Sequence, residues 1–225
     1  MEQTELEQVK EPEETAEQGA SNPKLAKFAN DFLELLESVL VSIFIILLVF
    51  AYFMRPVTVD GMSMFPTLNN GDQLVMYRLF YQPKPGDIVV VSNEEGHVLN
   101  ADGEAVSSGR ALNENLIKRV IAVAGQSVRV DASAGAVYVD DVKLDEPYIA
   151  ELTFTDDGAF SYPITIPEGY MFVMGDNRNH STDSRNSLVG IVKTEDALGK
   201  AYFRYRPAEP EEGDTWEKGN IGFIG

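Results

Sequence analysis

The stretch KRVIAVAGQSVRV, Lys118 to Val130, decides the fold class. It holds two short runs rich in β-branched residues, KRVIAVA (118–124) and SVRV (127–130), which flank Gly125 and Gln126. Runs of this kind between Gly, Pro, Asn and Asp are typical of short strands joined by turns. Short runs of β-branched and aromatic residues between turn-forming residues recur after Pro56, in DIVVV (87–91), AVYV (136–139), YMFVM (170–174) and KAYFRYR (200–206).

This spacing predicts a mainly antiparallel, all-β domain of sandwich or barrel type over residues 56–225. No helical run of useful length follows residue 55. The segment 92–115 is polar and rich in turn-forming residues, so we expect a loop or a hairpin excursion there. Residues near 131–168 are expected to form a smaller, inserted β subdomain.

The chain before this domain has a different composition. Residues 1–30 are dominated by Glu and Gln, and we predict a disordered, acidic arm because such a segment buries too little apolar surface to fold. Residues 31–40, DFLELLESVL, then show the apolar spacing of an amphipathic helix. From Ser38 to Met54 the chain runs for 17 residues without a charge. As a helix this stretch is about 25 Å long, near the lower limit for crossing a bilayer.

Three interpretations of residues 38–54 are open. A buried core helix is usually amphipathic, whereas this run is apolar on every face. A cleaved signal peptide requires small residues in an A-x-A-like pattern after the apolar run, and FMRPVTVDG offers none. We therefore predict that residues 31–55 comprise an amphipathic lead-in and a single, retained transmembrane helix. Lys24 and Lys27 before the helix, and Arg55 after it, favour a cytoplasmic N-terminus.

The composition of the 225-residue chain excludes several functional classes. Its formal net charge is −18, so binding to nucleic acid through counterion release is not expected. It has no cysteine, which excludes disulfides, thiolate zinc sites and cysteine nucleophiles. Its two histidines, His97 and His180, lie far apart among polar residues, so we expect both in exposed loops and predict no metal site. With no glycine-rich phosphate loop either, no cofactor is predicted.

The segment VDGMSMFPTL, Val59 to Leu68, contains a candidate nucleophile, Ser63. Gly61 allows unusual backbone angles just before the serine, and Pro66 makes the chain rigid just after it. The apolar neighbours of Ser63 fit neither a strand nor a helix pattern. We expect this segment to present a hydroxyl at the edge of an apolar surface.

A serine nucleophile needs a base, and Lys118 is the best candidate. Strand alternation places Lys118 on one face with Leu116 and Val120. Loss of water disfavours the ammonium form, so the pKa of such a lysine falls and its neutral amine accepts a proton. The alternative is a lysine on an edge strand whose amine reaches water.

The segment GDNRNHSTDSR, Gly175 to Arg185, concentrates carboxylates, guanidinium groups, amides and hydroxyls. One interpretation is a solvated loop with local Asx turns. The other is a buried brace, in which Asp–Arg pairs fix the loop and a hydroxyl such as that of Ser181 aims the lysine amine. Its position directly after the apolar run YMFVM favours the brace.

Taken together, SMFPTL, GDIVVV, IKRVIAVAG, PEGYMFVMGDNRNHSTDSR and the terminal IGFI resemble the type I signal peptidases, which are membrane-anchored Ser/Lys leader peptidases of bacteria. The likeness is greatest to the single-anchor form. It extends over roughly residues 38–225 with the motifs in the same order, and the acidic arm lies outside it. Each motif alone is moderately specific, and the set is highly specific.

The resemblance implies an all-β catalytic domain with a smaller appended β region. It also implies that Ser63 is the nucleophile and Lys118 the general base. The supporting roles that it implies are orientation of the lysine by Ser181, bracing by Asp183 and Arg185, and a further structural acid at Asp176.

The implied function is the removal of signal peptides from exported preproteins that carry small residues at the first and third positions before the cut. Membrane lipid is the other implied partner. The implied location is the bacterial plasma membrane, single-pass, with the catalytic domain outside the cytoplasm. A soluble-type, self-cleaving Ser/Lys regulator is an alternative, but it would need a DNA-binding domain. A non-enzymatic, membrane-anchored β module is the second alternative.

Two positions depart from the family pattern. Ala122–Gln126 replaces the usual Gly-Leu-Pro-Gly-Asp ending, which affects the turn after the strand that carries the base. Gly61 stands where some relatives have a serine that helps to hold the oxyanion. Backbone N–H groups, including that of Ser63, would then have to contribute more.

Overall fold

The computed structural model describes residues 23–210, 214 and 216–224. The chain divides into a first unit that ends at Leu47 and a second unit that begins at Leu48. Helix α1 (Pro23–Phe53) starts with a proline, which is favoured at the first helical position because its missing N–H has no intrahelical partner there. Residues 1–22 of the predicted acidic arm lie outside the described residues. Residues 23–30, which we expected to be disordered, form the first turns of α1 instead.

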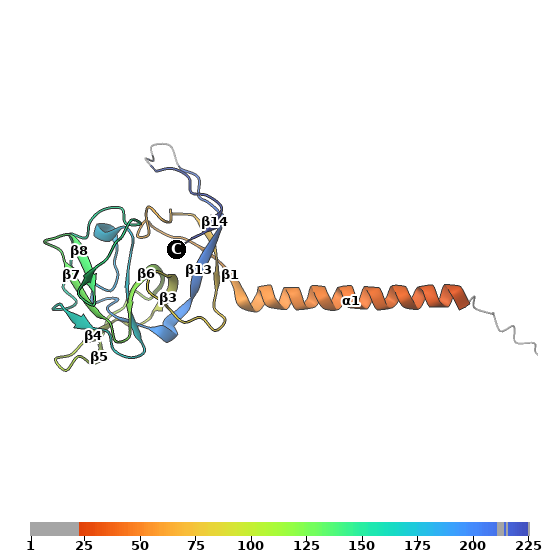
Figure 1. Ribbon diagram of the computed structural model, residues 1–225, viewed down its shortest axis with the longest axis horizontal. Helices are drawn as coiled ribbons and strands as arrows, with labels where there is room; N and C mark the ends of the chain where they lie inside the picture. Colours follow the sequence, from red (N-terminus) through yellow and green to blue (C-terminus); the bar gives the residue numbers. More distant parts are fainter. Residues whose placement is uncertain (1–22, 211–213, 215, 225) are drawn as a thin grey trace, which may run out of the picture. The chain divides into compact units, whose positions relative to one another are not determined.

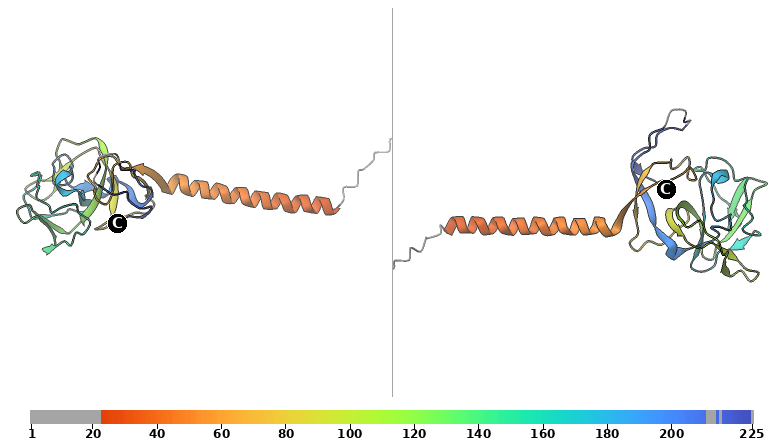
Figure 2. Two further views of the ribbon diagram at one scale, coloured as in Figure 1. Left: turned by 90° about the horizontal axis from the view of Figure 1, so that it is seen from above. Right: turned by 180° about the vertical axis from the view of Figure 1, so that it is seen from behind.

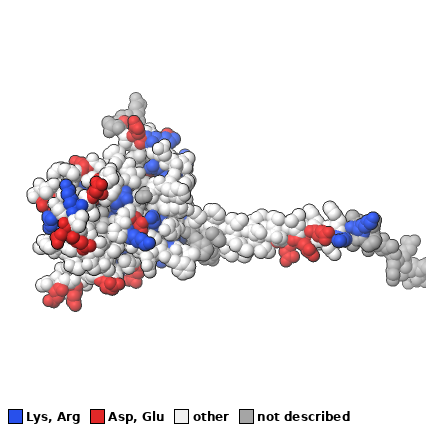
Figure 3. All heavy atoms as spheres, in the orientation of Figure 1, with Lys and Arg blue, Asp and Glu red and all other residues white. Residues whose placement is uncertain are grey.

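Charged side chains on α1 are confined to its first part, and the rest of its visible surface is uncharged (Figure 3). Within the part of the chain that the structure describes, no helix combines the length and apolarity needed to cross a membrane. The transmembrane helix predicted within residues 31–55 is therefore not confirmed.

The strands of the second unit form antiparallel sheets (Figure 1). The main sheet has eight strands in the order β1-β2-β13-β3-β6-β11-β12, with β14 paired to β13. Its members are β1 (Met54–Thr58), β2 (Gln73–Tyr77), β3 (Ile88–Asn93), β6 (Glu114–Val123), β11 (Tyr170–Met174), β12 (Val192–Lys193), β13 (Ala197–Arg206) and β14 (Gly222–Phe223).

A smaller sheet of four strands has the order β10-β7-β8-β9. Its strands are β7 (Ser127–Asp131), β8 (Ala136–Val139), β9 (Val142–Lys143) and β10 (Ile164–Thr165). It lies largely within the region expected to form a smaller subdomain, at the opposite end of the β unit from β13 and β14 (Figures 1 and 2). A separate hairpin pairs β4 (His97–Leu99) with β5 (Ala105–Ser107). The described helices after residue 53 are two short 3₁₀ turns, η1 (Arg178–His180) and η2 (Thr194–Asp196).

The all-β class predicted for this unit is confirmed, as is the hairpin within residues 92–115. One expectation about this hairpin is wrong. His97 is only 4% exposed, because its strand packs against a neighbouring segment rather than facing water. The backbone N–H of His97 donates to Val189 O, and His97 O accepts from Ile191 N–H.

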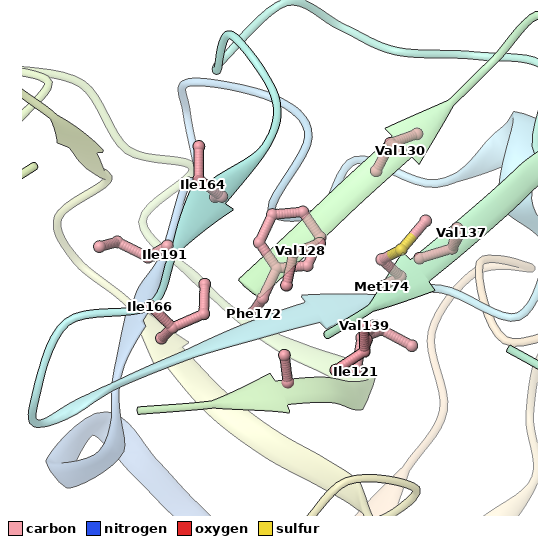
Figure 4. Packing of buried hydrophobic residues seen from close by; sticks show 11 residues of the cluster. Ile121, Val128, Val130, Val137, Val139, Ile164, Ile166, Phe172, Met174 and Ile191 are labelled. Atoms are coloured by element: carbon pink, nitrogen blue, oxygen red, sulfur yellow. The ribbon is translucent and has the colours of Figure 1, made fainter. Parts of the chain in front are cut away.

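The largest core cluster lies between the main sheet and the smaller sheet (Figure 4). Phe172 and Met174 of β11 lie at its centre and are fully buried. Val128 and Val130 of β7 belong to the same cluster and come from the smaller sheet. Burial of each such side chain stabilises the fold by about 1.5–3 kcal/mol. This core makes β11 rigid, and β11 leads directly into the Gly175–Arg185 segment.

Candidate active site

The segment Val59–Leu68, called the nucleophile segment because it carries the candidate nucleophile Ser63, lies between β1 and β2. Apolar side chains on either side of Ser63 anchor it. Val59, Met64 and Leu68 are buried in one core cluster, whereas Ser63 between them is partly exposed. Leu68 N–H donates to Met64 O at 2.9 Å, which tightens the chain after the serine. The segment thus presents the Ser63 hydroxyl at the surface, while buried side chains and a backbone hydrogen bond fix its backbone.

Gly61 supplies the unusual backbone expected before the serine. Its φ of +84° lies in the left-handed region that favours glycine. Its N–H donates to Asn70 Oδ1 at 2.9 Å. A side chain at this position would meet no atom within 4 Å, so the backbone conformation rather than space selects glycine here.

Lys118 extends from β6 to the candidate nucleophile. Its Nζ lies 2.9 Å from Ser63 Oγ and 3.2 Å from Ile117 O. The residue is only 3% exposed, as predicted for a lysine on an apolar strand. Burial lowers the pKa of the amine, and the charge of Arg185 adds to this effect, whereas the charges of Asp183 and Glu114 oppose it. Two residues that are 55 positions apart in sequence are therefore brought into hydrogen-bonding contact.

The predicted brace is a buried, bidentate ion pair between Asp183 and Arg185. Arg185 Nε donates to Asp183 Oδ1 at 2.8 Å, and Nη2 donates to Oδ2 at 2.7 Å. Gly175 N–H donates to the same carboxylate at 2.9 Å. Burial alone would raise the pKa of the Asp183 carboxyl. The hydrogen bonds and charge of Arg185, together with the Gly175 N–H and the charge of Lys118, outweigh burial and hold the pKa below its usual range. The carboxylate therefore stays ionised close to Lys118.

Asp176 forms a second buried pair, and its partners were not identified from the sequence. Arg119 Nε donates to Asp176 Oδ1 at 2.8 Å, and Arg119 Nη2 donates to Oδ2 at 2.7 Å. Thr67 Oγ1 donates to the same Oδ2 at 2.6 Å. The carboxylate thus joins the strand that carries Lys118 to the segment that carries Ser63. Strand alternation predicts that Lys118 and Arg119 point to opposite faces of their strand. Nothing in the sequence indicated which acidic residue would pair with Arg119.

Arg178 is the second buried arginine of the Gly175–Arg185 segment, and its partner was also not identified from the sequence. It forms an ion pair with Glu146, and its Nη1 donates to Thr153 Oγ1 at 2.9 Å. Its Nε donates to Gly175 O at 3.0 Å. Glu146 precedes Pro147 in a stretch without regular structure, so its sequence gave no signal of a partner.

Ser181 lies close to the site without a hydrogen bond. Its Oγ is buried and has no partner in the structure. The Cβ that a side chain at Gly175 would add falls 2.3 Å from Ser181 Oγ and 2.4 Å from Ser63 O, so only glycine fits between these residues. The orientation of Lys118 by Ser181 stays a prediction.

A cleft of about 650 Å³ opens over the Ser63–Lys118 pair. One wall is the segment 55–64, and another is the stretch 114–118 of β6. His180, whose side chain is 74% exposed as predicted, and Thr182 also line it. Among the described residues, no group of three or more His, Asp or Glu side chains is arranged to hold a metal ion. The cleft has room for an extended peptide segment, and Ser63 and Lys118 present a hydroxyl beside a buried amine to it.

Several known proteins are similar to this chain along most of its length. The family model "Signal peptidase, peptidase S26" matches residues 32–206. A probable signal peptidase I-1 from a Synechocystis species is 36% identical over 173 residues, which cover 75% of this chain and 80% of the relative. A signal peptidase I from Bacillus licheniformis is 30% identical over 190 residues, or 79% of this chain and 90% of the relative.

A crystal structure of a signal peptidase I from Enterococcus faecalis V583 aligns with a TM-score of 0.37 at 26% identity, covering 53% of this chain and 97% of that one. The family model covers more than three quarters of the chain, and the two relatives match along most of their own length. On these grounds the chain belongs to the signal peptidase family S26, a family of serine peptidases.

Proposed function

We propose that this protein removes signal peptides from exported preproteins by Ser/Lys acyl-enzyme catalysis. The observation that carries the proposal is the 2.9 Å contact between Ser63 Oγ and the amine of Lys118, which is 3% exposed. A buried amine whose pKa is lowered can be neutral, and a neutral amine within this distance accepts the serine proton.

In the acylation step, Ser63 Oγ attacks the scissile carbonyl while Lys118 Nζ takes the hydroxyl proton. The Oγ–C bond forms, the peptide C–N bond breaks, and the proton on Nζ passes to the departing amine of the mature protein. Neutral Lys118 then removes a proton from water, whose oxygen attacks the acyl carbon. The C–Oγ bond breaks, the proton on Nζ passes to Ser63 Oγ, and the signal peptide leaves with a free carboxylate. Such a base typically contributes about 10²–10⁴-fold to the rate.

The developing oxyanion needs hydrogen-bond donors, and Gly61 offers no side-chain hydroxyl. We assign this role to backbone N–H groups, that of Ser63 among them. One well-placed donor is worth on the order of 10²–10³-fold in kcat. The Asp183–Arg185 and Asp176–Arg119 pairs act indirectly in this scheme, because they hold the nucleophile and the base in place.

The proposed substrates carry small residues at the first and third positions before the cut, as the family resemblance implies. The test is cleavage of a preprotein with an A-x-A site by the detergent-solubilised full chain. Ser63→Ala and Lys118→Ala are tested beside the wild type. Cleavage after the second alanine by the wild type alone supports the proposal, whereas equal cleavage by either variant refutes it.

We also propose that residues 38–54 anchor the protein in the bacterial plasma membrane, with the catalytic unit outside the cytoplasm. The proposal rests on the 17 uncharged residues of this run. It also rests on exposed apolar side chains of α1 such as Phe44 (60%) and Leu47 (61%). In cells, the β unit should be digested by protease added to intact spheroplasts. Full protection of the β unit would refute this orientation, and extraction by alkaline carbonate would refute the anchor.

A further inference from the structure

Asn177 binds the backbone of the nucleophile segment in two places. Its N–H donates to Ser63 O at 3.0 Å, and its side-chain Nδ2 donates to Met62 O at 3.1 Å. The residue is 9% exposed. One side chain and its own backbone therefore hold two successive carbonyl groups, of which the second belongs to Ser63.

The carbonyl of Met62 shares a peptide plane with the N–H of Ser63. This peptide bond is trans, so the N–H points away from the direction of the carbonyl oxygen. Phe65 N–H also donates to Met62 O, at 3.1 Å, which closes the turn around the serine. With two donors on one oxygen, the plane is fixed, and the direction of the Ser63 N–H is fixed with it.

The Ser63 N–H itself has no acceptor among the described residues. Both Met62 and Ser63 line the cleft in which a substrate carbonyl would be attacked, so the peptide bond between them borders the place where an oxyanion would form. A donor that is already oriented costs no reorganisation when the negative charge develops. A hydrogen bond to the carbonyl of the same peptide also polarises the N–H.

We propose that Asn177 is a positioning residue that orients the Ser63 N–H toward the oxyanion of the transition state. This inference rests on the proposed function, in which that N–H is an oxyanion donor. Asn177 is suited to the role because both of its neighbours are locked. Asp176 is held by Arg119, and Arg178 is held by Glu146.

Two variants test the inference. Asn177→Ala removes the Nδ2 donor, and Asn177→Asp keeps the size but presents an oxygen to Met62 O. The backbone bond from residue 177 to Ser63 O remains in both variants. Asn179→Ala is the matched control, because Asn179 lies in the same segment and binds the backbone of Leu152, Phe154 and Thr155 instead. Thermal unfolding checks that each variant folds, and either Asn177 variant suffices for the test.

Four quantities are measured. The first three are kcat and KM for a signal-peptide substrate, and the inhibition constant of a peptide aldehyde of the same sequence, whose adduct with Ser63 carries an oxyanion-like oxygen. The dissociation constant of the uncleaved substrate is measured in the Ser63→Ala background with and without Asn177→Ala. We expect kcat to fall by about 10–100-fold, which is less than or equal to the loss of a whole donor. The inhibition constant of the aldehyde should rise by a similar factor. KM and the dissociation constant should change by less than about twofold, because ground-state binding does not use an oxyanion donor.

An unchanged kcat in both Asn177 variants, with wild-type cleavage intact, would refute this inference alone. So would a loss of substrate affinity equal to the loss of kcat, or an equal fall of kcat in Asn179→Ala. If the wild type neither cleaves the substrate nor binds the aldehyde, the proposed function fails and the inference fails with it.

Discussion

Replacement of Asp176 by asparagine should destabilise the protein more than a surface change of the same size. Asp176 is fully buried, and Arg119, its partner, is 4% exposed. The amide of an asparagine has one acceptor where the carboxylate offers two oxygens, so one guanidinium N–H would face an N–H₂ group. The variant therefore leaves the charge of Arg119 buried without a counterion.

The loss of one partner from a buried ion pair typically costs about 3–5 kcal/mol. For a folded unit of this size, about 1 kcal/mol corresponds to about 2–4 °C in Tm. We therefore expect Asp176→Asn to lower Tm by roughly 6–20 °C. The assay is thermal unfolding of the full chain in detergent at neutral pH, followed by far-UV circular dichroism.

The double variant Arg119→Met/Asp176→Asn is the control, because it removes the unpaired charge together with the carboxylate. It should recover much of the lost Tm, since a buried pair replaced as a whole is often nearly neutral. A fall of less than about 2 °C for Asp176→Asn would refute the reasoning that buried Arg119 depends on this carboxylate as its counterion. A double variant as unstable as the single one would show that the carboxylate contributes through Thr67 instead.

Lys118→Arg should abolish cleavage, because a guanidinium stays protonated; full activity would remove Lys118 as the base. The kcat/KM of the wild type should rise with pH and level off below about 10.4, the pKa of a free lysine, because burial lowers the pKa of Lys118; a flat profile in a pH-stable assay would contradict this. The same shift predicts a pH-dependent stability. The native state binds the Lys118 proton more weakly than the unfolded chain, so wild-type stability should rise with pH between the native pKa and about 10.4. Lys118→Met, which has no amine to bury, should have a higher Tm than the wild type at low pH. This difference in Tm should shrink as the pH rises through that window, and a constant difference would contradict the lowered pKa of Lys118. Ser181→Ala should weaken turnover without abolishing it, and an unchanged rate would reject an orienting role for this hydroxyl.

The sequence predicted the strands that have a clear apolar pattern and missed those that are very short. AVYV and YMFVM coincide with β8 and β11, because a run of β-branched and aromatic residues bounded by turns is a local signal. Strands of two residues, such as β12 and β14, are defined by pairing with a distant neighbour and carry no periodic signal of their own. At the start of the chain, residues 23–30 form helix although we assigned them to the acidic arm. They hold no acidic residue, and Leu25 and Phe28 extend the apolar pattern that begins at residue 31.

The residues of the candidate site also fall into those that were identified from the sequence and those that were not. Ser63, Lys118 and the Asp183–Arg185 pair were identified from segments whose composition is unusual. Arg119, Thr67 and Asn177 were not, because their roles depend on contacts across 57, 109 and 115 positions in sequence, respectively. A long-range hydrogen bond leaves no trace in local composition.

The electrostatic balance at Lys118 explains why a buried acid and a buried arginine must occur together beside this lysine. The carboxylate of Asp183 alone would favour the ammonium form of Lys118 and so oppose its action as a base. Arg185 binds both oxygens of that carboxylate, and its own charge lowers the pKa of Lys118. Desolvation is the largest influence on the pKa of Lys118, and Arg185 offsets part of the opposing effect of Asp183. A loop could be braced by many kinds of contact, but next to a lysine that must lose its proton, the brace has to be nearly neutral as a whole.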